Sequence, residues 1–96
     1  MIDNLEFEWD EGKAKTNLAM HGVSFFVAVA TFRRERIEII DDREDRGEER
    51  WVSLGRLGTE IYRVTFTWRG ESLVRIISTR RANENERQTY YGQIHP

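Results

Sequence analysis

The stretch IYRVTFTW, residues 61–68, decides the fold, because apolar and polar side chains alternate along it. Successive residues of a β-strand point to opposite faces of a sheet, so this alternation predicts a strand with one buried face. The opposite face carries Arg63, Thr65 and Thr67, and we expect it to be open. The apolar face, which we expect to pack against helices, carries Tyr62, Val64, Phe66 and Trp68.

Short turns connect this strand to its neighbours in the sequence. Glycine-centred turns at 57–59 and 69–71 predict strands before and after it, over 51–54 and 72–79. A β-branched run at 37–40 predicts a further strand, and the apolar–acidic alternation of residues 5–9 predicts a short first one. Consecutive strands joined by short turns pair in the antiparallel sense.

Helix boundary residues define two helices near the N-terminus. Asp10 is a typical N-cap for a helix over 11–21, and Gly22 is a typical residue to end it. Ser24 is placed to cap a second helix, Phe25 to Phe32.

A third helix begins at Asn83, and Glu86 three residues later indicates a capping box. We therefore predict an α+β fold: a small antiparallel sheet of four to five strands with two N-terminal helices and one C-terminal helix. We expect these helices to pack on one face of the sheet.

The composition limits the class of protein. Ninety-six residues predict a single domain over 1–96. With 39% hydrophobic and 33% charged residues, the chain is too apolar for a disordered protein and too polar for a membrane protein. The absence of cysteine excludes disulfides and thiolate metal sites, and with two histidines we expect no metal or other cofactor. The acidic N-terminus does not resemble a signal peptide, so we expect a cytoplasmic protein.

Charge is distributed unevenly along the chain. Residues 1–49 carry seven Lys/Arg against thirteen Asp/Glu, whereas residues 50–96 carry eight Arg against four Glu. Arginine binds phosphate or carboxylate groups through two parallel hydrogen bonds. The arginine-rich half therefore favours an anion site. The alternative is that these arginines are solvated and paired with nearby glutamates.

Four arginines are candidates for that site. If Val74 and Ile76 pack on the core, Arg63 and Arg75 project from the same open face, where they repel each other unless an anion lies between them. Arg80 and Arg81 follow at the strand end, before a helix N-terminus that also favours anions.

The first helix carries a polar line of Lys13, Asn17 and His21, spaced four residues apart. His21 is the candidate histidine for proton transfer, and the alternative is a capping role at the helix C-terminus. The apolar seam that we expect to pack beside this line consists of Ala14, Leu18 and Gly22.

Two blocks of sequence resemble those of BrnT-type toxins. The opening block is FEWD at 7–10, Lys13, Asn17 and HGVSF at 21–25. The closing block is RIISTRRA at 75–82, followed by Glu86-Arg87 and Tyr90. Together with the strands between them, these blocks span about residues 6–91 in the order and spacing of that family.

The resemblance implies a ribonuclease toxin of a type II toxin–antitoxin module, with a fold similar to that of RelE toxins. It implies that the protein cleaves RNA and inhibits translation. It also implies a BrnA-like antitoxin with a ribbon-helix-helix domain, and contact with operator DNA only through the toxin–antitoxin complex. We expect no membrane partner.

For this function we expect metal-independent cleavage, in which the ribose 2′-OH attacks the adjacent phosphate and the 5′-oxygen leaves. Arg75 and Arg80, with Arg63 as a third candidate, are assigned to the charge of the transition state. His21 or Lys13 would transfer protons, although Lys13 would need a lowered pKa. Weaker candidates for the general base are Glu48 and Glu49.

RNA binding is assigned to Arg81 and Asn17, and to Trp51 and Tyr90, whose rings could stack on a base. We expect the guanidinium groups to converge on one pocket the size of a phosphodiester. Two alternatives remain: a non-catalytic docking surface for an acidic protein segment, and a regulator that binds nucleic acid without cleaving it.

Overall fold

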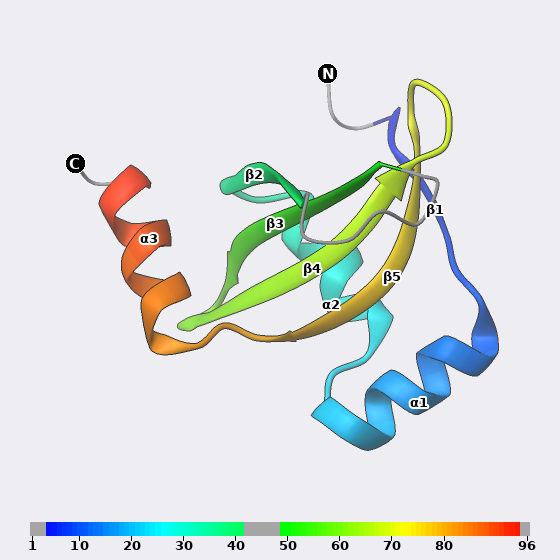
Figure 1. The fold of residues 1–96 in the computed structure, drawn as a ribbon, viewed down its shortest axis with the longest axis horizontal. Helices are drawn as coiled ribbons and strands as arrows, with labels where there is room; N and C mark the ends of the chain where they lie inside the picture. The colour runs from blue at the N-terminus through cyan, green and yellow to red at the C-terminus, as the bar shows by residue number, and fades with distance from the viewer. Residues whose placement is uncertain (1–3, 42–48, 95–96) are drawn as a thin grey trace.

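Residues 4–41 and 49–94 are described by a computed structural model, in which a twisted sheet is combined with helices (Figure 1). The elements are β1 (Glu6–Glu8), α1 (Glu11–His21), α2 (Phe25–Thr31), β2 (Arg36–Asp41), β3 (Arg50–Leu57), β4 (Glu60–Trp68), β5 (Leu73–Arg81) and α3 (Glu84–Ile94). The expected order of strands and helices is confirmed.

The five strands form one sheet in the order β1-β5-β4-β3-β2. Strands β2 to β5 are antiparallel, as expected from their short turns. The first strand departs from this prediction, because β1 pairs in parallel with β5, Phe7 lying opposite Val74. The sheet is therefore mixed: β1 enters it as an edge strand beside the last strand of the chain, and α1 and α2 lie in the connection that leads away from it.

A bulge interrupts the ladder between β4 and β5. Thr65 lies opposite Ser78, whereas the next residue of β4, Phe66, lies opposite Ile76, so Ile77 is an extra residue in β5. Strict alternation would place Ser78 on the same face as Ile76. The bulge instead moves Ser78 to the face of Thr65, and Thr79 lies on the core face opposite Val64.

The main core lies between α2 and one face of the sheet. Phe25, Ala28 and Phe32 pack there, and the ring centroids of Phe32 and Phe66 are 5.0 Å apart in an edge-to-face contact. The apolar alternation of β4 is thereby confirmed. The buried strand residues of this core are Val64, Phe66, Val74 and Ile76.

The third helix packs on the opposite face, which corrects the expectation that all helices share one face. Tyr90 of α3 lies in a second buried cluster with Leu54 and Ile61. Ile61 lies two residues before Arg63 in β4, so the two side chains share a face of the sheet. Leu54 lies directly opposite Arg63 in β3 and is on the same face. The apolar side chains of Leu54 and Ile61, at one end of the face that carries Arg63, therefore form the surface on which α3 packs.

The predicted helix boundaries hold with small differences. The Asp10 side chain accepts a hydrogen bond of 3.0 Å from the Lys13 backbone N–H, which confirms it as the N-cap of α1. Gly22 ends this helix with a φ of 69°, a left-handed conformation that glycine adopts easily. Ser24 occupies the N-cap position of α2 without a capping bond from its side chain, and α2 ends at Thr31, one residue early.

Strand β3 continues through Gly55 to Leu57, three residues beyond the expected end at Leu54. A Cβ atom at Gly55 would lie 3.0 Å from the Cβ of Thr31 in α2. Glycine at this position therefore lets the helix approach the sheet closely.

Candidate active site

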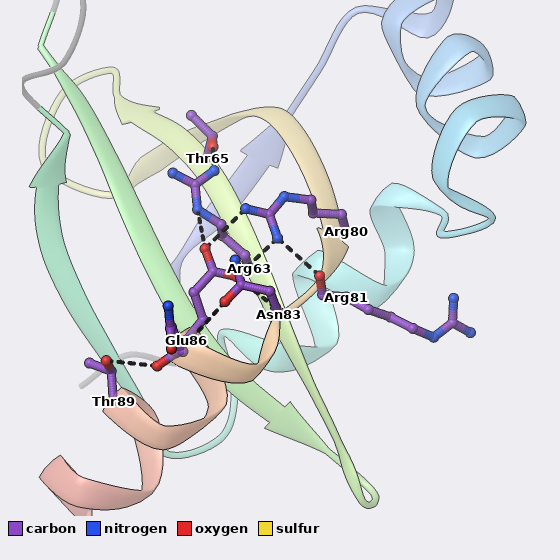
Figure 2. Close-up of polar contacts among 8 residues, drawn as sticks. Arg63, Thr65, Arg80, Arg81, Asn83, Glu86 and Thr89 are labelled. Atoms are coloured by element: carbon purple, nitrogen blue, oxygen red, sulfur yellow. Dashed lines mark hydrogen bonds and ion pairs between the residues drawn. The ribbon is translucent and has the colours of Figure 1, made fainter.

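Arg63 and Arg80 lie directly opposite each other on β4 and β5, on the sheet face that also carries α3. Figure 2 shows Glu86, from the first turn of α3, pointing between them. Arg80 donates two hydrogen bonds to the Glu86 carboxylate, Nη1 to Oε1 at 2.9 Å and Nη2 to Oε2 at 3.0 Å. The Nε of Arg63 lies 3.2 Å from the same Oε2. Two strands and one helix thus contribute to a single cluster, the Arg63–Glu86–Arg80 cluster.

The position of the Glu86 carboxylate follows from how α3 begins. Glu86 Oε1 accepts a hydrogen bond from the Asn83 backbone N–H, and Asn83 Oδ1 accepts one from the Glu86 N–H, both at 2.9 Å. This is the predicted capping box, in which the glutamate side chain reaches back toward the start of the helix. Because β5 ends just before Asn83, the same side chain meets the last arginines of the strand.

Electrostatics keep this carboxylate charged. Burial alone raises the pKa of Glu86, but hydrogen bonds from Arg80 and Asn83 and the charges of Arg80 and Arg63 outweigh it. The pKa of Glu86 therefore lies below its ordinary value. The side chains of Arg63, Glu86 and Arg80 are 13%, 21% and 33% exposed, so only Arg80 presents a sizeable part of its surface to solvent.

Further bonds fix the two guanidinium groups. Arg63 Nη1 donates to Thr65 Oγ1 at 3.2 Å, and Arg80 Nη1 donates to the carbonyl of Arg81 at 3.1 Å. The bulge in β5 is essential to this arrangement. Arg75 and Arg80 are five residues apart, so in a regular strand they would lie on opposite faces of the sheet.

Arg75 lies on the same face but belongs to a second cluster. Its Nη1 lies 3.0 Å from Glu8 Oε2, and the Nε of Arg69 lies 4.0 Å from the same oxygen. The expected convergence of Arg63, Arg75 and Arg80 on one pocket is therefore wrong, because each of two carboxylates binds a separate pair of arginines. Four arginines against two glutamates leave a net charge of +2 among these residues, so the face keeps an anion-binding character.

Arg81 is placed apart from these residues. It lies opposite Tyr62, on the other face of the sheet, and Figure 2 shows its side chain pointing away from the Arg63–Glu86–Arg80 cluster. Its Nε lies 3.8 Å from Glu60 Oε1, and its side chain is 57% exposed. Arg80 and Arg81 are thus adjacent in sequence and separated by the sheet.

Asn17 has a structural role, which corrects its assignment to RNA binding. Its side chain is buried, and its Nδ2 donates to the carbonyls of Val23 and Thr79 at 3.0 and 2.8 Å. Its Oδ1 accepts the Thr79 N–H at 3.1 Å. Because β1 pairs only with residues 73–75 of β5, Asn17 takes the place of a neighbouring strand farther along this edge. The expected seam through Leu18 is also wrong, since that side chain is 51% exposed.

The two candidates for proton transfer lie beside a groove between α1 and β5. Lys13 and His21 line it, both exposed, together with Ile77 and Ser78 of the bulge region; the groove measures about 500 Å³. Ser78 is the strand neighbour of Thr65, which contacts Arg63. The groove therefore borders the arginine-bearing face without belonging to the Arg63–Glu86–Arg80 cluster.

The two aromatic candidates differ in exposure, Tyr90 being buried and Trp51 half-buried. Tyr90 is 2% exposed, and its hydroxyl donates to the Glu35 carbonyl at 3.1 Å. Burial, followed by the charge of Glu35, raises the pKa of Tyr90, so the phenol stays neutral. Trp51 lies opposite Phe66 and packs against the main core on the other side of the sheet. The Tyr90 assignment is corrected, because this buried ring stabilises the fold. Trp51 is half-buried and lines a small groove with Trp68 and Arg69, so its assignment to RNA binding stays a prediction.

Of the two weaker base candidates, the structure describes Glu49. Glu49 has an exposed side chain, and its carbonyl accepts a hydrogen bond from Thr67 Oγ1 at 2.7 Å. Glu48 lies outside the described residues. Within those residues, no group of three or more His, Asp or Glu side chains is placed to hold a metal ion. In the same part of the chain, no helix is long and apolar enough to cross a membrane.

Three contributors were missed by reasoning from the sequence: Glu86 and Glu8 as partners of the arginines, and Thr65 as a support for Arg63. The signal for Glu86 was present in the capping box, since a glutamate at that position points back toward the strand before the helix. Glu8 required knowledge that β1 pairs with β5, which local patterns do not contain.

The fold and its arginine-bearing sheet face agree with a small ribonuclease toxin. A family model described as the ribonuclease toxin BrnT of type II toxin–antitoxin systems matches residues 9–86. The chain therefore belongs to the BrnT family, and membership implies an antitoxin partner.

Among solved structures, the chain is similar to the ribonuclease toxin BrnT of Brucella abortus. The two are 26% identical with a TM-score of 0.58, and the match covers 83% of this chain and 99% of that one. A search of curated proteins finds no match.

Proposed function

We propose that the protein cleaves RNA as an endonuclease without a metal ion, and that Arg63 and Arg80 contact the scissile phosphate. The observation that carries this proposal is the Arg63–Glu86–Arg80 cluster: two guanidinium groups, opposite each other on adjacent strands, fixed at the edge of the solvent-accessible surface. Guanidinium groups bind the non-bridging oxygens of a phosphodiester through parallel hydrogen bonds.

The reaction that fits this site uses the substrate's own hydroxyl. The ribose 2′-oxygen attacks the neighbouring phosphorus, the bond to the 5′-oxygen breaks, and the products carry a 2′,3′-cyclic phosphate and a 5′-hydroxyl. Negative charge builds up on the phosphate oxygens in the transition state. Fixed cations that are already oriented stabilise this charge without reorganising.

Proton transfer is assigned to Lys13 and His21, which line the groove beside β5. One group would accept the 2′-hydroxyl proton and the other would protonate the departing 5′-oxygen. Arg75, which lies farther along the same sheet face with Glu8, would bind a neighbouring phosphate of the RNA strand. The RNA strand would therefore run from the groove across β5 to the arginines.

In the cell, this activity would inhibit translation in the cytoplasm by destroying RNA. The antitoxin would be a ribbon-helix-helix protein of the BrnA type. The toxin would contact operator DNA only through the complex with this antitoxin. Membership of the family and the chemistry proposed for the site support these proposals.

One observation favours a second candidate function. The exposed arginines already bind carboxylates, Glu86 and Glu8. The same face could therefore dock an acidic protein segment without catalysing a reaction.

The test uses one RNA oligonucleotide and its 2′-deoxy equivalent, both with EDTA present. The proposal predicts cleavage of RNA alone, with a cyclic phosphate on the product, since the deoxy substrate lacks the nucleophile. Cleavage of both substrates, or loss of activity with EDTA, contradicts the mechanism. Tight binding of an acidic peptide without any RNA cleavage supports the docking function instead.

A further inference from the structure

We propose that Glu86 is a positioning residue for this reaction: its carboxylate holds the guanidinium groups of Arg63 and Arg80 in the orientation in which they bind a phosphodiester. This inference rests on the proposed function. It assigns to Glu86 neither a proton transfer nor a contact with RNA.

The hydrogen bonding of Glu86 argues against the role of a general base. A carboxylate has about four acceptor positions. Here one oxygen accepts Arg80 Nη1 and the Asn83 N–H, and the other binds Arg80 Nη2 and Arg63 Nε. Three of the four positions accept hydrogen bonds, and the Arg63 guanidinium lies 3.2 Å from the remaining one. A carboxylate held in this way is poorly placed to take the proton of a 2′-hydroxyl.

Arg80, by contrast, keeps donors available for a substrate. A guanidinium group has five N–H bonds. The described contacts of Arg80 use three of them, two to Glu86 and one to the Arg81 carbonyl. The remaining two belong to a side chain that is 33% exposed, so a phosphate can reach them while the bonds to Glu86 stay in place.

Glu86 is also poorly suited to the role of a removable placeholder. To leave the arginines, its side chain would have to break the bidentate pair with Arg80, the contact with Arg63 and its own capping bond to Asn83. Charge-assisted hydrogen bonds of this kind are among the strongest in proteins. A fixed carboxylate that orients two cations fits these contacts better than one that a phosphate displaces.

The experiment compares Glu86→Gln with Glu84→Gln, a matched change two residues earlier in the same helical turn. Glu84 is exposed, and its described contact is a hydrogen bond of 3.2 Å from Gln88. Glu86→Gln removes the charge and turns part of the acceptor into a donor facing Arg80. We expect its kcat to fall by about 100-fold, the effect of a small misplacement at a reacting centre, with KM changed less. Glu84→Gln should retain wild-type kinetics.

A double-mutant cycle with Arg80→Ala separates positioning from general stabilisation. If Glu86 acts through the arginines, Glu86→Gln should reduce kcat much less in the Arg80→Ala background, where its main partner is gone. Activities are expressed per folded molecule, measured by circular dichroism at the assay temperature. Glu86→Asp, which keeps the charge but shortens the reach, should recover part of the lost kcat even if Glu86→Gln folds poorly.

The outcomes distinguish this inference from the proposed function. If Arg80→Ala cleaves RNA like the wild type, the proposed function fails. If Arg80→Ala loses most of its kcat but Glu86→Gln retains full kcat per folded molecule, only the positioning role is overturned. A rise in activity for Glu86→Gln also overturns it, because the carboxylate would then compete with RNA. Equal fractional losses in both backgrounds would indicate a structural role and overturn it as well.

Discussion

Replacing Asn17 with alanine tests the finding that this buried amide joins α1 to the edge of β5. The substitution removes three hydrogen bonds, of 2.8, 3.0 and 3.1 Å, to the backbone of Thr79 and Val23. It leaves the N–H and carbonyl of Thr79 and the carbonyl of Val23 without these partners at a buried position.

The expected cost follows from the polar groups left behind. An unpaired buried donor or acceptor costs about 1–3 kcal/mol, and water entering the space left by the side chain recovers part of this. We therefore expect Asn17→Ala to lower the free energy of unfolding by about 3 kcal/mol. In a domain of this size, that corresponds to a fall in Tm of about 12–24 °C.

The assay is urea and thermal unfolding, followed by circular dichroism. Lys15→Ala, an exposed change in the same helix, is the control and should stay within about 0.5 kcal/mol of the wild type. RNA cleavage per folded molecule should be unchanged in Asn17→Ala. Wild-type stability combined with lost cleavage would refute this reasoning and restore a binding role for Asn17.

Three other substitutions test separate parts of the structure. Tyr90→Phe removes the bond to the Glu35 carbonyl and should cost about 1 kcal/mol in urea unfolding without affecting RNA cleavage; a selective loss of cleavage would contradict the buried role of the ring. Gly55→Ala places a Cβ atom 3.0 Å from the Thr31 side chain and should cost about 1–3 kcal/mol, and unchanged stability would show that α2 does not approach β3 closely. The folded-state pKa of Glu86 is lowered, so its stabilising effect is complete at neutral pH and is lost as the pH falls from 4.5 through the folded value. The difference in unfolding free energy between wild type and Glu86→Gln should therefore shrink in acid, and a difference that grows would contradict this sign.

Local patterns predicted those parts of the fold that depend on neighbouring residues. The alternation of residues 61–68 placed Val64 and Phe66 in the core because strand geometry alone determines which side chains share a face. Asp10, Gly22 and the pair Asn83–Glu86 marked helix ends for the same local reason.

Long-range pairings could not be read from such patterns. The bulge at Ile77 depends on how β5 fits β4, and it reverses the facing of every residue after it, Arg80 included. The parallel pairing of β1 with β5 brings Glu8 to Arg75, although 67 positions separate them. Asn17 was assigned to a polar line along the first helix because its partner, Thr79, lies 62 positions away in sequence.

The candidate site was therefore predicted in part. Arg63 and Arg75 were found from strand facing and Arg80 from its place at the strand end, but their glutamate partners were not found, because each ion pair joins separate elements. Tyr90 was misassigned because an aromatic residue in a short sequence fits a core and a stacking platform equally well.

The central claim is that the face with Arg63 and Arg80 is where RNA phosphate is bound during cleavage. Arg80→Gln and Arg81→Gln test it most directly, since the two residues are adjacent, lose the same charge and lie on opposite faces of the sheet. Measured as kcat/KM on one RNA substrate, Arg80→Gln should lose at least about 100-fold, whereas Arg81→Gln should stay within about threefold. Equal losses in the two variants, or a larger loss for Arg81→Gln, would contradict the claim.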